Sequence, residues 1–548
     1  MHLRSKHIRS GAAPVVLAVT LVTALRLALL AVFPTNLMFD EAQYWTWAQH
    51  LSWGYYSKPP LIAWLIRAST ALLGNSEWAV RATSPVLHGF AAISVYATAR
   101  SLVANSRTLS IRRVERIARW ACVIYLSSPG VTVGATMMTT DAPLLALWGW
   151  ATYFVVRAVR STHAGGRAII IAGVLAGLGV LAKYTMLFAV PALAIFAAWP
   201  VQNVSRRTRF ARAGIFGAIT LTVMAPNIFW NLSHGLVTVA HTLHHTDGIG
   251  HAVHADRFVH FVGAQFGVFG PISMAMLITA LPGFMRRGAR DPRCRLIVYL
   301  TLPLLATMTL LSTLDHAWAN WAAPAYVTGS IAVALVLVGS RAGVRWLRGA
   351  TAFNVTAGLV IVALAASSMY SNAVVPSWLN LNIRKRGQRV LTRKILEVRQ
   401  DYPGSVLLFD SRHIMAPVMY YMERDGHRVS AVKWDEDGHP DDYYEMHTHI
   451  NDYIGRDFLL ITGLPRVQTI AHRFEQTTRL RDIVVSSGTY HVYRCEHLHD
   501  ASSPRHTQTG RRIAGGPHRG STHAGALPGS RATSTTAWPS ASSTADLP

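Results

Sequence analysis

The chain has 548 residues, of which 51% are hydrophobic and only 14% carry charged side chains. Soluble proteins carry about 25% charged residues, so this composition excludes an ordinary soluble protein and indicates a polytopic membrane protein. A net charge of +25 is common in nucleic-acid-binding proteins, but here the arginines lie in short clusters between apolar runs. The positive-inside rule for membrane proteins predicts that distribution, so we expect no nucleic-acid partner.

Eleven segments approach the roughly 20 apolar residues that a membrane-spanning helix needs. They are residues 13–33, 83–104, 117–136, 142–158, 168–182, 184–200, 211–229, 257–284, 295–313, 321–340 and 352–372. The first segment lacks a small-residue cleavage site, so we predict a retained helix and not a signal peptide. The fifth and sixth are short and meet at Ala182-Lys183-Tyr184, so this pair is the weakest part of the count.

The loops between these segments alternate between basic and nearly uncharged. Clusters such as Arg206-Arg207 and Arg286-Arg287 fall on one side, which the positive-inside rule assigns to the cytoplasm. The first loop, residues 34–82, then lies on the periplasmic side. With an odd number of spans, the region after residue 372 lies there too.

The first loop reads FDEAQYWTWAQHLSWGYYSKPPLIAW and combines two adjacent acids, a dense aromatic band and Lys58. The aromatic residues are spaced as in helices that lie in the membrane interface. A carboxylate such as Asp40 beside a dry site is suited to act as a general base, and the alternative is a solvated helix-capping acid. Two prolines after Lys58 restrict the backbone, so its ammonium is suited to a phosphate, and the alternative is a snorkelling lysine.

Two further charged residues are predicted on the same side of the membrane. Asp141 lies at the start of the fourth span, where it is either a site residue or a helix N-cap. Lys183 lies between the fifth and sixth spans, and an ionisable residue at membrane depth is functional by default. The alternative for Lys183 is a snorkelling residue at a helix end.

The loop of residues 227–257 is rich in histidine. Such density can bind a metal, but the loop lacks a tight ligand motif, so we favour hydrogen bonding to phosphate or sugar. The chain contains no GxxxxGK[ST] nucleotide-binding loop, and we interpret residues 173–179 as a small-residue surface for helix packing.

After residue 372 the sequence changes character, because charge rises and apolar runs shorten. Residues 373–497 predict a small periplasmic α/β domain, with helices at 387–400 and 414–424 and strands at 405–409, 457–462 and 481–485. Residues 498–548 are rich in Ser, Thr, Gly, Pro, His and Arg without periodicity, which predicts a disordered basic tail. Residues 1–372 form the predicted transmembrane domain.

The segments FDEAQYWTWA, YYSKPPLIAW, MMTTDAPLLALW, GVLAKYTMLF, PNIFWNLSHGLVTVAHTLHH and HAWANWAAPAY occur in this order within residues 10–340. Together they resemble the bacterial lipid-carrier-dependent glycosyltransferases, relatives of the dolichyl-phosphate-mannose protein mannosyltransferases and of the aminoarabinose transferase. The resemblance implies the GT-C fold: an all-α transmembrane domain of about eleven helices with a small periplasmic domain. It also implies transfer of a hexosyl or pentosyl group from a polyprenyl phosphate to lipid A, another envelope glycan or a protein.

The same resemblance implies roles for particular residues. The sugar would be transferred in one inverting displacement at the periplasmic face of the inner membrane, with Asp40 as the base. The expected catalytic residues are Asp40, Glu41 and Asp141. The expected ligands of the donor phosphate are Lys58, Lys183, Tyr184 and Arg81. The expected substrate-binding residues are Tyr44, Tyr55, His234, His241 and His244.

One position departs from the resembled family. In aminoarabinose-transferase-like relatives the residue before Lys-Pro-Pro is acidic and implicated in metal binding, whereas here it is Ser57. We therefore predict no metal site, and a divalent cation stays open. A transporter of lipid-linked sugars is the alternative function, but such proteins tend to have internal repeats and midplane charges, which are not evident here. A non-catalytic scaffold would leave Asp40, Lys58 and Asp141 unexplained.

Overall fold

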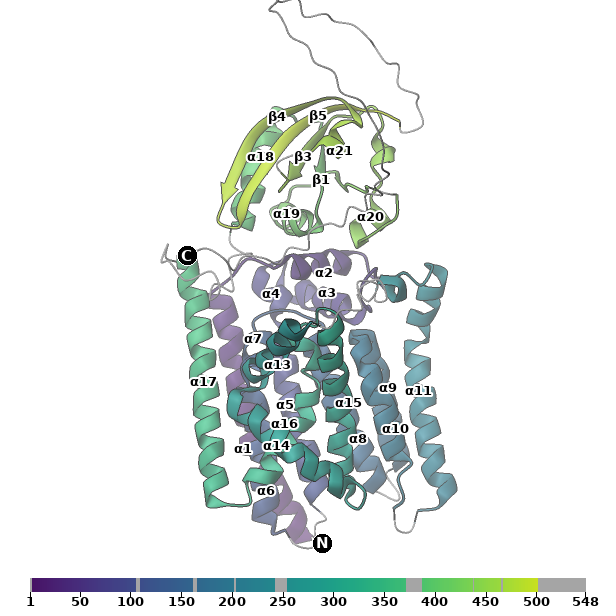
Figure 1. Cartoon of the computed structure of the whole chain (residues 1–548), viewed down its shortest axis with the longest axis vertical. Helices are drawn as coiled ribbons and strands as arrows, with labels where there is room; N and C mark the ends of the chain where they lie inside the picture. Colours follow the sequence, from purple (N-terminus) through teal and green to yellow (C-terminus); the bar gives the residue numbers. More distant parts are fainter. Residues whose placement is uncertain are drawn as a thin grey trace, which may run out of the picture. The chain divides into compact units, whose positions relative to one another are not determined.

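The computed structural model describes residues 2–500 except 105–108, 161–164, 202–203, 242–253, 371–386, 437 and 465–466, and it describes no side chains of residues 2–10 and 365–370. The predicted tail, residues 498–548, therefore lies outside the described residues from position 501 onward. Among the described residues, those from 2 to 370 form helices and their connecting segments, and a mixed α/β domain follows (Figure 1).

The transmembrane part is built from long apolar helices joined by short helical segments. The elements are α1 (His2–Val32), α5 (Thr83–Val103), α6 (Ile111–Ser127), α7 (Pro129–Gly134), α8 (Asp141–Arg160), α9 (Gly165–Ala182), η1 (Tyr184–Phe188), α10 (Ala189–Ala197), α11 (Arg206–Ser233), α13 (Ala255–Phe269), α14 (Pro271–Gly288), α15 (Pro292–Leu314), η2 (Ala319–Ala322), α16 (Ala325–Leu337) and α17 (Arg341–Tyr370). Three more helices form the first loop: α2 (Phe39–Gln49), α3 (Leu61–Leu73) and α4 (Glu77–Arg81).

Within the described ranges, seven helices are long and apolar enough to cross a membrane, or eight if the bent pair α13–α14 counts as one span. Three shorter apolar helices, at residues 61–73, 184–197 and 325–337, accompany them. The chain is thus a multi-pass membrane protein, and the count of eleven spans stays a prediction.

Two segments that were predicted as single continuous spans are each divided into two helices, so both predictions are corrected. Residues 257–284 form α13 and α14, which meet at an angle of 111°. Gly270 stands at the bend with φ of 91°, and a Cβ there would lie 2.3 Å from the Asn354 side chain. Residues 117–136 are divided between α6 and α7, because Ser128 is extended before Pro129 and proline disfavours a helical residue in front of it.

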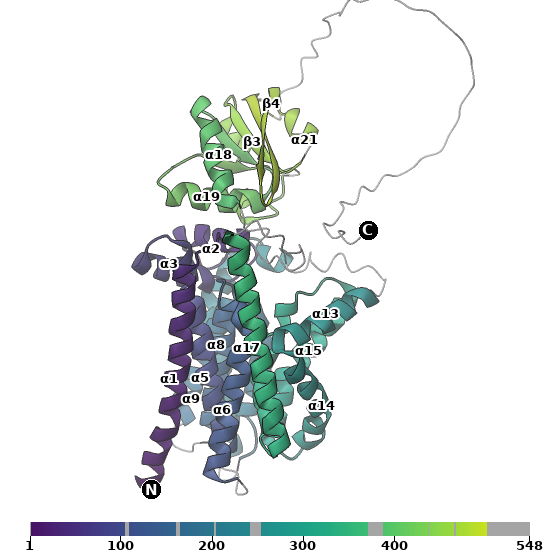
Figure 2. The same ribbon diagram turned by 90° about the vertical axis from the view of Figure 1, so that its left-hand side faces the viewer.

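Helix packing in this part depends on small residues. α8, α9, α10 and α11 lie side by side (Figures 1 and 2). A Cβ at Gly173 would lie 2.8 Å from Cβ of Ile219, and one at Gly177 would lie 2.5 Å from Cβ of Val223. The packing surface predicted at residues 173–179 is therefore confirmed, because only glycine allows α9 to approach α11 this closely.

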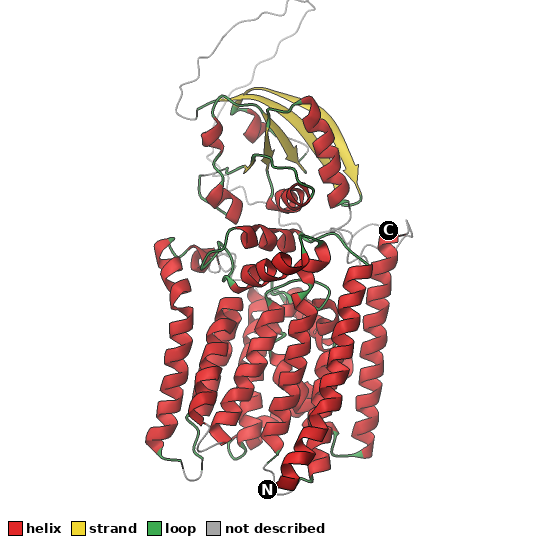
Figure 3. Cartoon of the chain, turned by 180° about the vertical axis from the view of Figure 1, so that it is seen from behind, coloured by secondary structure: helices red, strands yellow, loops and turns green. Residues whose placement is uncertain are grey.

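The C-terminal domain contains one five-stranded mixed sheet, drawn as arrows in Figure 3. Its strands are β1 (Val406–Phe409), β2 (Ala431–Lys433), β3 (Phe458–Thr462), β4 (Phe474–Val485) and β5 (Gly488–Leu498), in the order β2-β1-β3-β5-β4. Its helices are α18 (Gln388–Asp401), α19 (Arg412–Arg424), α20 (Tyr443–His447), η3 (Ile450–Tyr453) and α21 (Gln468–Ala471). β1 is parallel to β2 and β3, whereas β3–β5 and β5–β4 are antiparallel.

The sequence prediction found most of this domain. The structure contains the predicted helices near 387–400 and 414–424 and all three predicted strands, although β4 begins seven residues before the predicted 481. The sequence analysis missed β2 and β5. β2 has only three residues, and β5 mixes polar and apolar residues because one part of it is exposed. β1 and β3 are buried throughout, which explains their unbroken apolar sequences.

Candidate active site

The first loop folds into helices whose aromatic side chains are buried. Trp47 stacks on Tyr55 with ring centroids 4.5 Å apart, and Trp45 meets Tyr420 of α19 edge-on at 5.0 Å. Trp47 also contacts Tyr443 of α20 at 5.9 Å. The sequence analysis expected these rings in the membrane interface. Those on α2 pack instead against the C-terminal domain, because that domain offers a complementary aromatic surface that the local sequence does not reveal.

Glu41 and Arg81 form a fully buried ion pair that ties this loop together. The two Glu41 oxygens accept bonds from Arg81 Nε at 2.7 Å and Nη2 at 2.6 Å, and from the backbone N–H groups of Met38 and Met138, each at 3.0 Å. Arg81 donates three more bonds, to the Thr35 carbonyl, the Thr35 hydroxyl and the Asn36 carbonyl. All five N–H donors of the guanidinium are thereby used.

Because these hydrogen bonds use all the donors of Arg81 and hold both oxygens of Glu41, the roles of the two residues need a different interpretation. Arg81 is only 1% exposed and has no N–H group left for a donor phosphate, so its geometry favours a structural role over the predicted phosphate contact. Glu41 is 2% exposed and holds the start of α2 against α4 and the segment before α8. Its support of Asp40 is therefore positional.

Asp40 follows the opposite pattern, although it is the next residue along α2. Its side chain is 44% exposed and has one ion-pair partner, Arg412 Nη1, at 3.3 Å. Asp40 lies at the first turn of α2, where the positive end of the helix dipole favours a carboxylate. An accessible and lightly bonded carboxylate is suited to accept a proton from a substrate hydroxyl.

Lys58 lies near Asp40 and presents an ammonium for which the described residues offer no hydrogen-bond or ion-pair partner. Burial, and then the neighbouring Lys183, lower the pKa of Lys58 to about 8, while Asp40 and Asp141 act in the other direction. These influences, and that of Arg412, place Lys58 within electrostatic reach of four other charged residues. An unpaired, partly desolvated ammonium is suited to bind an anion.

The predicted residues Asp141 and Lys183 meet in the structure. Lys183 Nζ lies 2.7 Å from Asp141 Oδ1, and Asn320 Nδ2 donates to Asp141 Oδ2 at 2.6 Å. Asp141 begins α8, whereas Lys183 is the extended residue between α9 and η1. Both Asp141 oxygens bind side chains, and among the described residues no backbone N–H group donates to them, so the geometry favours the site alternative over the N-cap. Three distant chain segments meet at this carboxylate.

Tyr184, beside Lys183, uses its hydroxyl for hydrogen bonds within the protein. The hydroxyl donates to Asn227 Oδ1 at 2.9 Å and accepts from Asn231 Nδ2 at 3.3 Å, while Asn227 Nδ2 donates to the Trp53 carbonyl at 2.7 Å. A chain of contacts thus joins η1, α11 and the first loop. These bonds favour a role of Tyr184 in supporting this loop, and its contact with the donor phosphate stays a prediction.

The two tyrosines predicted to bind substrate differ in whether their hydroxyl groups are hydrogen-bonded within the protein. The Tyr55 hydroxyl donates to the carbonyls of Trp47 and His50 and accepts from Ser52 N–H, so it is committed to the loop. The Tyr44 hydroxyl has no hydrogen-bond partner in the part of the chain that the structure describes. Burial, together with the nearby Asp40 carboxylate, raises the pKa of Tyr44 well above its ordinary value, so the phenol stays protonated.

The structure describes two of the three predicted histidines, and these two have different partners. His234 is exposed at the end of α11, where its ring stacks on Trp230 and its Nδ1 lies 2.8 Å from the Trp230 carbonyl. The His241 ring contacts Tyr56 at 5.0 Å, and His244 lies outside the described residues. Among the residues with described positions, no group of three or more His, Cys, Asp or Glu side chains is arranged to hold a metal ion. The absence of a metal site therefore stays a prediction, and a requirement for a divalent cation stays open.

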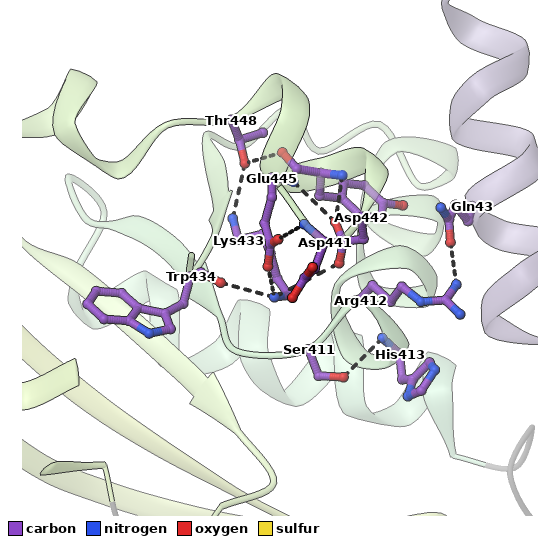
Figure 4. Close-up of polar contacts among 11 residues, drawn as sticks. Gln43, Ser411, Arg412, His413, Lys433, Trp434, Asp441, Asp442, Glu445 and Thr448 are labelled. Atoms are coloured by element: carbon purple, nitrogen blue, oxygen red, sulfur yellow. Dashed lines mark hydrogen bonds and ion pairs between the residues drawn. The ribbon is translucent and has the colours of Figure 1, made fainter. Parts of the chain in front are cut away.

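Arg412 is the site residue that the sequence analysis missed. Its Nη1 donates to Gln43 Oε1 at 2.7 Å (Figure 4). The same Nη1 donates to Asp40 Oδ1, and the guanidinium lies 5.2 Å from the Phe39 ring centre. One signal for it was present in the sequence. Arg412 follows a strand that is buried throughout, and functional residues in α/β sheets gather beyond the carboxyl ends of parallel strands.

Together, the residues form a charged centre where helices of the membrane part meet the first loop and α19. Asp40, Lys58, Arg412 and the Asp141–Lys183 pair come from five separate segments. The centre holds an accessible carboxylate beside cations, which suits proton abstraction coupled to departure of an anionic leaving group.

Comparison with known proteins identifies the family. The sequence pattern of the dolichyl-phosphate-mannose-protein mannosyltransferase family matches residues 57–230. The lipid A galacturonosyltransferase of Rhizobium johnstonii is 32% identical over 449 residues, which cover 80% of this chain and 89% of that protein. The undecaprenyl phosphate-alpha-4-amino-4-deoxy-L-arabinose arabinosyl transferase of Serratia proteamaculans is 24% identical and matches 45% of this chain and 43% of its own length.

Solved structures show the same fold. The crystal structure of ArnT from Cupriavidus metallidurans in the apo state covers 89% of this chain and 98% of its own, with a TM-score of 0.56 and 13% identity. The structure of that protein bound to undecaprenyl phosphate has the same TM-score, with 12% identity. The family predicted from the sequence is thereby confirmed. This chain belongs to the lipid-carrier-dependent membrane glycosyltransferases with the GT-C fold.

Proposed function

We propose that the protein transfers a uronic acid from a polyprenyl phosphate to a lipid A-type glycolipid at the periplasmic face of the inner membrane. The name of the Rhizobium johnstonii relative supports the sugar and the acceptor, since that protein matches most of this chain. The distribution of arginines supports the periplasmic orientation of the first loop.

The observation that carries this proposal is the unpaired ammonium of Lys58 beside the accessible carboxylate of Asp40. Membrane enzymes that use a lipid phosphate need a cation at the phosphate and a base at the acceptor hydroxyl. A half-buried ammonium without a partner is costly unless a ligand supplies the negative charge, so Lys58 fits the phosphate. Asp40, with one long ion pair, fits the base.

The reaction would follow one displacement. Asp40 accepts the proton of the acceptor hydroxyl while that oxygen attacks the anomeric carbon. The bond from the anomeric carbon to the phosphate oxygen breaks, and its electron pair leaves with the lipid phosphate. Lys58 stabilises the charge that develops on the phosphate, and the anomeric configuration inverts. The Asp141–Lys183 pair, neutral in sum, would orient the donor beside Lys58.

The direct test uses the purified full chain in lipid nanodiscs with undecaprenyl phosphate galacturonic acid and lipid A. Mass spectrometry should detect lipid A with one added uronic acid, and the anomeric proton coupling of the product should show inversion relative to the donor. Neutral hexose and aminoarabinose donors serve as controls. Transfer of only a control sugar would reject the uronic acid, and donor movement across vesicles without transfer would favour the transporter.

Two further measurements test the membrane orientation and the need for a metal ion. A periplasmic reporter fused after residue 375 should be active, and a signal restricted to the cytoplasm would contradict the orientation. Transfer should also persist after exhaustive chelation, because Lys58 supplies the cation at the phosphate and Ser57 replaces the acidic residue of metal-binding relatives. Loss of activity that added divalent cation restores would show that a metal takes part.

A further inference from the structure

Arg412 is placed where the C-terminal domain meets the charged centre. β1 ends at Phe409, and Ser411 caps α19 by accepting a hydrogen bond from the His413 N–H group. Arg412 is therefore the first residue of α19, beyond the carboxyl end of a central parallel strand. Figure 4 shows its side chain extending toward Gln43 on α2.

The contacts of Arg412 use only part of its guanidinium. Nη1 donates to Gln43 Oε1 at 2.7 Å and to Asp40 Oδ1 at 3.3 Å. The three remaining N–H donors, on Nε and Nη2, have no hydrogen-bond partner among the residues that the structure places. The side chain is 34% exposed, so a ligand can reach these donors. An Nε–Nη2 edge is the planar fork that binds a carboxylate with two parallel hydrogen bonds.

Arg412 is not needed to attach the C-terminal domain to the first loop. Farther along α19, Arg424 lies 2.7 Å from Glu77, the Tyr420 hydroxyl donates to the Asn75 carbonyl, and Tyr421 accepts from the Leu37 N–H group. The Arg412–Asp40 pair is longer and more exposed than the Arg424–Glu77 pair, so it adds little to attachment. A role in ligand binding explains the position of Arg412 better.

The charges of the centre leave room for a second anionic group. Lys183 is paired with Asp141, and Arg412 contacts Asp40 through Nη1 alone, while Lys58 lies within electrostatic reach of both Asp40 and Arg412. The phosphodiester of the donor would neutralise Lys58. A uronic acid carries one more negative charge than a neutral sugar, and the unused edge of Arg412 matches its carboxylate in charge and shape.

We propose that the free Nε–Nη2 edge of Arg412 is the subsite for the carboxylate of the donated uronic acid. The inference rests on the proposed function, and it makes the C-terminal domain a contributor to sugar selection. Gln43 and Phe39 orient the guanidinium, and Asp40 holds its inner edge.

The test compares two ligands that differ only at this carboxylate: a short-chain polyprenyl phosphate galacturonic acid and its methyl ester. Dissociation constants are measured with the full chain and with Arg412→Gln, Arg412→Lys and Arg424→Gln. The wild type should bind the acid at least about tenfold more tightly than the ester, a difference of roughly 1.4 kcal/mol. Arg412→Gln should abolish this preference, and Arg412→Lys should retain part of it because the charge remains without the fork.

Arg424→Gln is the matched control, since it removes an arginine from the same helix but outside the centre. It should keep the acid-to-ester ratio of the wild type. Equal binding of acid and ester by the wild type would overturn the inference, as would an unchanged ratio in Arg412→Gln. A change confined to the KM of the acceptor would assign Arg412 to an acceptor phosphate instead. Failure of the wild type to transfer the uronic acid at all would refute the proposed function separately.

Discussion

Asp40 and Glu41 are neighbours on α2 but have opposite environments. Glu41 is buried and accepts four hydrogen bonds, two of them from Arg81. Asp40 is nearly half exposed and has a single partner at 3.3 Å. Successive residues of a helix point about 100° apart, so one carboxylate faces the core of the loop and the other faces the charged centre.

The difference shows how a structural charge can be told from a chemical one. A side chain whose hydrogen-bonding capacity is filled holds the fold and has nothing to offer a substrate. A side chain with unused capacity in a polar centre is available for binding or catalysis. By this criterion we propose structural roles for Glu41, Arg81, Tyr55 and Tyr184. We propose contact with substrate for Asp40, Lys58, Tyr44 and Arg412.

The largest expected effect separates the two acids by activity. Asp40→Asn should reduce the transfer rate by roughly 10²–10⁴-fold, the usual contribution of a general base. Its melting temperature should stay close to that of the wild type, because the Asp40–Arg412 pair is exposed. Initial rates and thermal unfolding in the same detergent check both statements. Full activity of Asp40→Asn would remove Asp40 from the role of base.

The second prediction concerns the stability of the other acid. Glu41→Gln leaves the buried Arg81 guanidinium without its counter-charge, which should cost about 3–5 kcal/mol of folding stability. Thermal unfolding and protease resistance of the first loop should both show the loss. Asp40→Asn, one residue away, is the matched control. If Asp40→Asn were the less stable of the two proteins, the contrast between the acids would be reversed.

The third prediction applies the same contrast to two tyrosines on the loop. Tyr55→Phe removes three hydrogen bonds between its hydroxyl and the backbone of the loop, so stability should fall by about 1–3 kcal/mol while the donor KM stays unchanged. Tyr44→Phe should preserve stability and alter the KM or the rate. Melting curves and steady-state kinetics distinguish these outcomes, and the opposite pattern would mean that hydrogen-bond saturation does not identify structural residues here.

The smallest expected effect is the pH dependence of donor binding. Only the protonated ammonium of Lys58 attracts a phosphate, and its pKa in the free protein is about 8. Affinity for the polyprenyl phosphate sugar, a phosphodiester whose phosphate keeps one negative charge in this range, should therefore be constant from about pH 6 to pH 8 and decline by up to about tenfold per pH unit above it, as the charge of Lys58 is lost. Lys58→Arg should remove this decline because arginine stays charged. A profile of the wild type that is flat to pH 10 would exclude Lys58 as the ligand.

The sequence by itself determined the membrane character, the alternation of basic and nearly uncharged loops, and the family. These features depend on composition, on the length of apolar runs and on short motifs. It also predicted that Asp40, Asp141, Lys58 and Lys183 lie on the same side of the membrane. Most of the α/β domain was evident as well, since fully buried strands and amphipathic helices leave local patterns.

Only the tertiary structure decided which of these residues are free to act. Whether Arg81 has an unused N–H group depends on the carbonyls of Thr35 and Asn36 and on Glu41, some 40 residues away. At the bend between α13 and α14, a Cβ on Gly270 would collide with Asn354, which lies 84 residues farther along the chain. Arg412 joined the centre through a separate domain, 372 residues after Asp40. Such facts arise from long-range packing and hydrogen-bond geometry, which no local pattern of residues encodes.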